Sequence, residues 1–262
     1  MSPKTLRQHV KPFVPDPLLA AWRAVQRRRS RMKNHRAYQH ELAGKSGLEV
    51  GGPSAFFRHV LPVYSVIGAL DGVNFATTTM WEGQIAAGGR FAYAPGLTGL
   101  QFIAEATELR DVADGRYEFL LSSNCLEHVA NPLKALREWT RVVQPGGLLL
   151  LVLPNQKANF DHRRQVTRFE HLLDDERRNV GEDDLTHLDE ILALHDLERD
   201  PWAEGRENFE RRSRDNLKYR GLHHHVFDPA LIEQMARHLQ LSTVLLDTTP
   251  TDFVFLGRTP RR

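Results

Sequence analysis

Histidines and acids gather in the segment that follows Asn155, where they could supply a general base or bind a metal ion. The seven histidines between Gln156 and Val226 are His162, His171, His187, His195, His223, His224 and His225. Histidine titrates near neutral pH and can take a proton from a reacting hydroxyl. Any two of these imidazoles with a nearby acid could also bind a divalent cation.

Four residues of this segment are our candidates for catalysis. His162 closely follows an apolar run that we expect to be a core strand. Asp184 and His187 are three residues apart and could share one face. His225 stands just before the next regular helix, again near the edge of the sheet where ligands bind. For each histidine, an ordinary hydrogen-bonded surface role is the alternative.

The elements that must position these residues are clearest in the stretch Tyr117 to Asn155. Its first residues, 117–121, form an apolar and aromatic run that predicts a buried strand. Residues 131–143 have helical spacing, with Asn as N-cap and Pro at the first helical position. A Pro-Gly-Gly turn then precedes six consecutive apolar residues, 148–153, which predict a strand buried on both faces. The stretch is therefore a right-handed βαβ unit.

A glycine-rich loop and an acid upstream suggest a nucleotide-like ligand. Gly51 and Gly52 follow a brief strand, and glycines let the backbone approach a ligand closely. Asp71 follows the apolar run Leu61–Leu70, which we predict to be the second strand. In α/β nucleotide folds an acid at that place accepts hydrogen bonds from ribose hydroxyls. Ordinary Gly-Pro and Asp-Gly turns are the alternative interpretations.

In their order and spacing, these pieces resemble the class I methyltransferases that use S-adenosylmethionine (SAM). The motifs that carry the resemblance are Leu48-Glu49-Val50-Gly51-Gly52, Leu126-Glu127-His128, Asn131-Pro132 and Pro145-Gly146-Gly147. The resemblance covers about Gly44 to Asn155 and Phe227 to Arg258. Pro53 and Ser54 depart from the family's usual Gly-x-Gly arrangement.

The resemblance implies an α/β fold: a Rossmann-like, seven-stranded, mostly parallel sheet with helices on both faces and a closing antiparallel pair. It implies SAM as the cofactor. The expected cofactor-binding residues are Glu49, Gly51, Gly52, Ser54, Asp71, Glu105, Ala106, Ser123 and Asn124. Glu105, at the end of a third strand, would read the adenine amino group. His128 is a further candidate base beside the cofactor turn, whereas Glu127 would fix the loop.

We expect four segments along the chain. They are an N-terminal basic helical extension (1–40), a SAM-binding core (41–155), an insertion with the acceptor site (156–226) and the C-terminal part of the core (227–262). The polar insertion, which weakly resembles that of enzymes acting on sugars, favours O-methylation of a sugar hydroxyl on an oligosaccharide or glycan precursor. Because such a hydroxyl is a poor nucleophile, a histidine base or a metal such as Mg²⁺ should assist. Another small-molecule natural product as acceptor, and a non-catalytic cofactor- or glycan-binding protein, are the alternatives.

Charge and composition limit the binding partners and the cellular compartment that we expect for the protein. The net charge is only +2, but no acid occurs from Pro17 to His40, where seven arginines and lysines cluster. This basic segment predicts either a solvated face or contact with phosphate, an anionic glycan or a membrane surface. No nucleic-acid-binding motif is seen and no apolar run approaches the ~20 residues that span a bilayer. Cys125 is the single cysteine, which fits a reducing cytoplasm. A homo-oligomer is left open.

Overall fold

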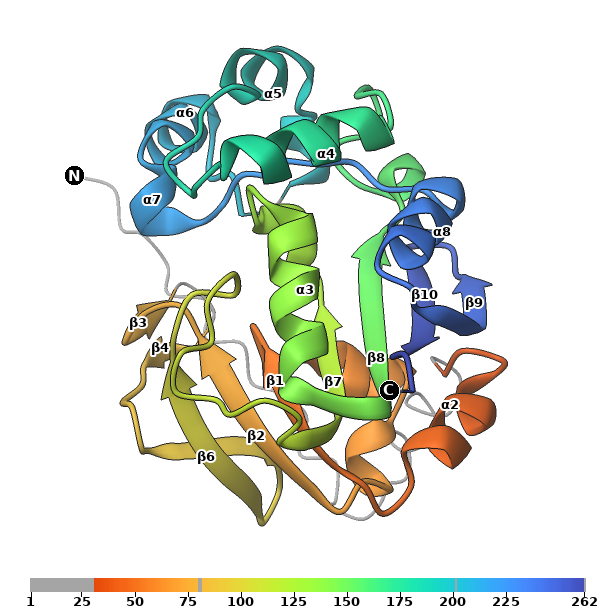
Figure 1. Cartoon of the computed structure of the whole chain (residues 1–262). Helices are drawn as coiled ribbons and strands as arrows, with labels where there is room; N and C mark the ends of the chain where they lie inside the picture. The colour runs from red at the N-terminus through yellow and green to blue at the C-terminus, as the bar shows by residue number, and fades with distance from the viewer. Residues whose placement is uncertain (1–30, 80–81, 201, 262) are drawn as a thin grey trace, which may run out of the picture.

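The structure, a computed structural model, describes residues 31–79, 82–200 and 202–261. An eight-stranded sheet forms its centre, with helices on both faces (Figure 1). The strands are β1 (Ser46–Val50), β2 (Ala69–Asn74), β5 (Arg90–Ala94), β6 (Leu97–Ile103), β7 (Tyr117–Ser123), β8 (Val143–Pro154), β9 (Ser242–Thr248) and β10 (Asp252–Arg258). A separate two-stranded ladder joins β3 (Thr78–Thr79) to β4 (Gly83–Gln84).

The strand order β5-β6-β2-β1-β7-β8-β10-β9 confirms the predicted Rossmann-like architecture. Strands β6, β2, β1, β7 and β8 run parallel, and β10 lies antiparallel between β8 and β9. The sheet has one strand more than the predicted seven. The extra strand, β5, forms an antiparallel hairpin with β6 at the sheet edge. Its sequence, RFAYA, is short and rich in small residues, so its periodicity alone was a weak signal.

Seven helices accompany the sheet in the described part of the chain. They are α2 (His35–Leu42), α3 (Pro132–Val142), α4 (Phe169–Arg178), α5 (Leu188–Leu194), α6 (Arg206–Arg214), α7 (Asn216–Tyr219) and α8 (Pro229–His238). The predicted start of α3 is confirmed, because the Asn131 side chain accepts a hydrogen bond from the Lys134 amide at 3.1 Å. Helix α8, which follows the insertion, likewise begins with a capping aspartate, Asp228, and a proline, Pro229.

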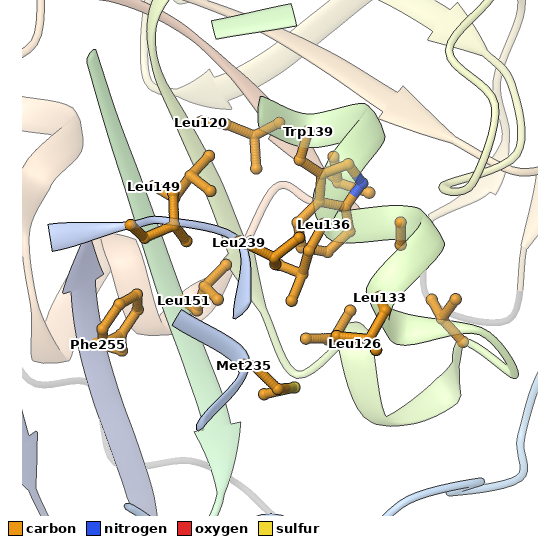
Figure 2. Packing of buried hydrophobic residues seen from close by; sticks show 14 of the residues in the cluster. Leu120, Leu126, Leu133, Leu136, Trp139, Leu149, Leu151, Met235, Leu239 and Phe255 are labelled. Atoms are coloured by element: carbon orange, nitrogen blue, oxygen red, sulfur yellow. The ribbon is translucent and has the colours of Figure 1, made fainter. Parts of the chain in front are cut away.

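Strand β8 is buried on both faces, as its run of apolar residues predicted. Leu149 and Leu151 pack with α3 and α8 through Trp139 and Met235 (Figure 2). The intervening residues of β8 face a second apolar cluster, which includes Tyr38 from α2. Alternation of side chains along a strand therefore places one run of leucines in two cores.

The prediction that Leu61–Leu70 is the second strand is wrong. A short helical turn, Phe56–Val60, comes before this region, a second one, Val63–Ser65, lies within it, and β2 begins only at Ala69. Pro62 and Gly68 interrupt the run, and its apolar side chains pack as turns into the second cluster. The end of β2 therefore falls three residues after Asp71, at Asn74.

The N-terminal segment is only partly described. Residues 1–30 of the predicted basic helical extension (1–40) lie outside the described residues. Helix α2 packs on the core: the buried Tyr38 hydroxyl donates to Asp247 Oδ2 at 2.9 Å and to the Val254 carbonyl at 3.0 Å. No helix in the described ranges is long and apolar enough to cross a bilayer.

The insertion between β8 and α8 places α4, α5, α6 and α7 above the carboxyl ends of the parallel strands (Figure 1). Strands β7 and β8 point toward these helices. In open α/β sheets ligands bind outside the carboxyl ends of the strands. The insertion therefore covers the edge at which a ligand is expected.

Candidate active site

A cavity of about 550 Å³ opens at the carboxyl ends of β1, β2, β6 and β7. We call it the sheet-edge cavity. Its lining includes Gly51, Ser54, Asn74, Phe75, Glu105, Ala106, Ser123, Asn124, Cys125, His128, Glu182 and Arg220. Six of the nine expected cofactor-binding residues are in this set. Its volume lies within the range of small-molecule sites.

Two turns bring the backbone close to this cavity. Gly51 has φ +80°, and a Cβ there would lie 3.0 Å from Cys125 Sγ, so a side chain is disfavoured by conformation and space. Asn124, after β7, has φ 48°, a conformation that asparagine tolerates better than most residues. The buried Ser123 hydroxyl lines the cavity and has no hydrogen-bond partner among the described residues. A polar ligand could satisfy it.

Glu49 lies beneath the glycine-rich loop, not in the cavity lining. Its carboxylate accepts from the Ser54 amide at 3.0 Å and from the Tyr64 hydroxyl at 2.6 Å. Burial raises the pKa of Glu49 to about 8, although these hydrogen bonds act in the opposite direction. A Cβ on Gly52 would lie 2.2 Å from the Glu49 carboxyl carbon, so Gly52 makes room for this acid. Both residues shape the loop, and neither is positioned as the direct contact we expected.

Asp71 is also misplaced by the sequence prediction. It lies in mid-strand, where its carboxylate accepts from the Tyr117 hydroxyl at 2.7 Å and from the Leu100 amide at 2.8 Å. Asn74 ends β2 instead and lines the sheet-edge cavity, with its side chain donating to the Gly52 carbonyl at 3.0 Å. Because β2 starts late, it ends at Asn74. Asn74, rather than Asp71, therefore occupies the position at which we expected a contact with ribose.

A second cavity, of about 530 Å³, lies between the core and the insertion. We call it the insertion cavity. It shares Asn124, His128, Trp202 and Arg220 with the sheet-edge cavity. The rest of its lining combines aromatic and polar side chains, among them Glu127, Asn159, Phe160, Phe209, Arg212, Ser213, Tyr219, His223 and Asp252. Two adjoining cavities can hold a donor and an acceptor side by side.

His128 stands where the two cavities meet. Its Nδ1 lies 3.0 Å from the Leu222 carbonyl, which can only accept, so Nδ1 carries the proton and Nε2 keeps a lone pair. Burial, and then the neighbouring His223, lowers the pKa of His128 to about 3. The ring is therefore neutral at physiological pH.

Glu127 and His223 complete a small polar cluster around His128. One nitrogen of each ring and one Glu127 oxygen lie within 4.8 Å of one another. Burial raises the pKa of Glu127 to about 7, and its Oε2 is buried without a hydrogen-bond partner in the described structure. Burial opposes charge on His223, but the Asp161 carboxylate, 2.5 Å from its Nδ1, outweighs this and raises its pKa. Arg164 in turn holds Asp161 at 3.1 Å.

Arg220 connects the insertion to the sheet through its side-chain contacts. Its guanidinium donates to Glu105 Oε1 at 2.6 Å, lies 3.1 Å from Glu182 Oε2 and stacks 4.9 Å from the Phe75 ring centroid. Burial raises the pKa of Glu182 to about 7 against the opposing charge of Arg220. The sequence offered no local signal for this contact, because Arg220 is one of many charged residues in the insertion.

The structure does not bring the four predicted catalytic residues to either cavity. His162 Nε2 lies 2.8 Å from Asp196 Oδ2, and the Asp184 carboxylate accepts from the Thr186 hydroxyl at 2.6 Å. His187 and His225 belong to a separate histidine cluster with His171. Instead, His128, which we considered a secondary candidate, lines both cavities, and His223 lines the insertion cavity.

Three consecutive histidines diverge into three environments. His223 faces Asp161, His224 Nε2 lies 3.1 Å from Asn216 Nδ2, and His225 Nε2 lies 3.1 Å from the Ala130 carbonyl. Side-chain alternation in an extended segment would place His223 and His225 on one side, but the two residues lie in different sites.

Comparison with known proteins agrees with this geometry. Residues 65–151 match the family model of a methyltransferase domain. An uncharacterized methyltransferase of Mycobacterium sp. (strain JLS) is 37% identical over 109 residues, which are 41% of this chain and 38% of that protein. An uncharacterized methyltransferase of Mycobacterium ulcerans (strain Agy99) is 32% identical over 111 residues, 42% of this chain and 39% of that protein. The chain thus matches less than half the length of these curated relatives.

Among solved structures, a SAM-dependent methyltransferase from Mesorhizobium loti aligns with a TM-score of 0.50 and 13% sequence identity. The alignment covers 86% of this chain and 95% of that one, and it shows a shared fold. Residues 65–151 therefore match a methyltransferase domain, and the chain shares the fold of SAM-dependent methyltransferases. These matches support SAM as the cofactor expected from the sequence.

Proposed function

We propose that the protein transfers a methyl group from SAM to a hydroxyl oxygen of a small polar acceptor, most specifically a sugar. The observation that carries the proposal is the junction of the two cavities at His128. The sheet-edge cavity would hold SAM and the insertion cavity the acceptor. A location in the cytoplasm stays a prediction from the single cysteine.

The residues of the sheet-edge cavity fit SAM. The unpartnered Ser123 hydroxyl and the close backbone at Gly51 suit a ligand with polar groups pressed against the loop. Asn74 stands at the strand end where nucleotide folds bind ribose, and its amide can both donate and accept. Glu105 at the end of β6 keeps one carboxylate oxygen beyond the Arg220 contact and can face the adenine amino group.

His128 would act as the general base. When bound, SAM supplies a methyl group to the acceptor oxygen, and its sulfur keeps the electron pair of the broken bond. The hydroxyl proton passes to Nε2 of His128, while Nδ1 keeps its own proton on the Leu222 carbonyl. A neutral imidazole of low pKa suffices, because the hydroxyl proton becomes strongly acidic as the oxygen–carbon bond forms. Positioning of donor and acceptor in adjoining cavities supplies the rest of the acceleration.

The lining of the insertion cavity supports a sugar as acceptor. Phe160, Phe209 and Tyr219 offer flat apolar faces, whereas Asn159 and Arg212 offer hydrogen-bonding groups. A sugar has both apolar C–H faces and many hydroxyls, so it needs such a mixture. A purely apolar slot would favour a flat hydrophobic acceptor instead.

The residues near His128 do not fit Mg²⁺. Magnesium prefers an octahedral shell of oxygen ligands, whereas the cluster here offers two imidazoles and one carboxylate. We therefore derive no step through this ion.

Two measurements test the proposal. Calorimetric titration should show binding of SAM and of its demethylated product; no binding at millimolar ligand would leave only a non-catalytic protein with this fold. Labelled-methyl transfer to a panel of oligosaccharides, monosaccharides and phenols should label sugars, and added Mg²⁺ should not be required. Transfer to apolar phenols alone would replace the sugar with another small-molecule acceptor.

A further inference from the structure

We propose that His171, His187 and His225, with Asp175 beside them, bind a zinc ion that holds the insertion together. The four residues come from three places in the chain. His171 and Asp175 are one turn apart on α4, His187 is the N-cap of α5, and His225 belongs to the segment that returns to the core. None of them lines the sheet-edge cavity or the insertion cavity.

The donor atoms converge at distances that suit one small ion. His171 Nε2 lies 2.9 Å from His187 Nε2 and 3.2 Å from Asp175 Oδ2. Ligands at 2.0–2.2 Å from a tetrahedral zinc ion are about 3.3–3.5 Å apart. The two separations from His171 lie just below this value, and one nitrogen of each of the three histidines lies within 4.8 Å of the other two.

Two buried polar atoms of the cluster are left without hydrogen-bond partners. Asp175 Oδ2 lies near two imidazoles, but in directions that make no hydrogen bond, and the Asp175 side chain is only 5% exposed. His225 is 1% exposed, and because its Nε2 faces the Ala130 carbonyl, a lone pair stays on the unpartnered Nδ1. Such uncompensated polar atoms are costly in a protein interior. A bound cation would satisfy them together.

The surroundings resemble the outer shell of a metal site. His187 Nδ1 lies 3.6 Å from Glu190 Oε2, on the opposite side of the ring from the cluster. Metal-ligating histidines commonly direct their second nitrogen at such a carboxylate, which orients the ring.

The chemistry of the donors favours zinc over magnesium or calcium. Imidazole suits transition metals, and three histidines are a donor set that zinc takes in proteins. Because none of the three lines either cavity, the ion would be structural. It would join α4, α5 and the return segment, and so fix the wall from which His223 enters the insertion cavity.

The experiment uses the full chain, stripped with chelator and then titrated with Zn²⁺ or Co²⁺. We expect one ion per chain, a rise in the melting temperature with Zn²⁺, and the strong visible absorption of tetrahedral Co²⁺. His171→Ala and His187→Gln should each abolish tight binding, whereas His162→Ala, which removes another insertion histidine paired with a carboxylate, should retain it.

Three results would overturn the site. They are no bound metal in the wild-type chain, equal binding in His187→Gln and wild type, and loss of the metal in His128→Gln with retention in His171→Ala. The last would move the ion to the cluster at the cavity junction. Circular dichroism of each variant checks folding, and the Co²⁺ spectrum of the wild-type chain decides the coordination even if a variant does not fold. Metal content and spectra do not depend on methyl transfer, so this test is independent of the proposed activity.

Discussion

Arg220 Nη2 donates to Glu105 Oε1 at 2.6 Å, and this bond joins the insertion to the carboxyl end of β6. The two residues are 115 positions apart in the chain. The same guanidinium lies against Glu182 within the insertion. One side chain therefore connects the insertion to the sheet and lines the sheet-edge cavity, where the cofactor would bind.

Arg220→Met should remove the contacts of Arg220 with Glu105 and Glu182. The change leaves Glu182 largely buried without its partner, which should cost about 1–3 kcal/mol of unfolding free energy. Binding of SAM should weaken as well, because Arg220 lines the cavity. Urea unfolding and calorimetric titration measure the two effects. Arg214→Met, which removes an exposed arginine of α6, is the matched control; equal losses in both variants would contradict the role of Arg220.

His128→Gln should lower the rate of methyl transfer while leaving SAM binding close to that of the wild type. Removal of a general base typically costs roughly 10²- to 10⁴-fold in rate. Single-turnover transfer of labelled methyl and calorimetry separate the two steps. His162→Ala should keep its turnover, since that ring pairs with Asp196 away from the cavities. A fully active His128→Gln protein would remove His128 as the base.

Gly51→Ala should weaken SAM binding more than a similar change elsewhere. The residue has φ +80°, and the new Cβ would press on Cys125 beside the cavity. Gly96→Ala provides the control, because Gly96 has φ +74° but no atom within 4 Å of the added Cβ. Both variants should lose about 1–2 kcal/mol of stability from backbone strain. Only Gly51→Ala should also raise the dissociation constant; an unchanged constant would separate the loop from cofactor binding.

Glu49→Gln should change how stability depends on pH. Because burial raises the pKa of Glu49 to about 8 in the folded state, the unfolded chain releases this proton first, near pH 4.5. The wild-type protein should therefore lose stability as the pH rises from about 4.5 to about 8, by an amount on the order of a few kcal/mol. The glutamine variant lacks this proton, so its stability relative to wild type should improve over the same range. Urea unfolding at pH 5, 6.5 and 8 measures the difference, and parallel curves would contradict the shift.

The sequence by itself determined the βαβ unit, and its resemblance to a known family implied the parallel sheet and its antiparallel ending. The βαβ unit depends on local patterns: the apolar run of β8, the cap at Asn131 and the turn at Pro145 to Gly147. Each pattern records whether a residue is buried or where an element ends, and neighbours in the chain are enough to fix that. The same patterns were misleading at Leu61–Leu70, where Pro62 and Gly68 turned an apolar run into helical turns and so moved the strand end to Asn74.

Only the tertiary structure decided which polar side chains meet. Adjacent histidines 223, 224 and 225 reach three environments, although alternation along an extended segment would place the first and the third on one side. Asp161 meets His223 across 62 positions, and Glu105 meets Arg220 across 115. Such pairs depend on where a long insertion folds back onto the sheet. Composition and spacing indicated that the insertion held histidines and acids, but the return path of the chain placed His223 in the insertion cavity, beside His128 at the junction of the two cavities.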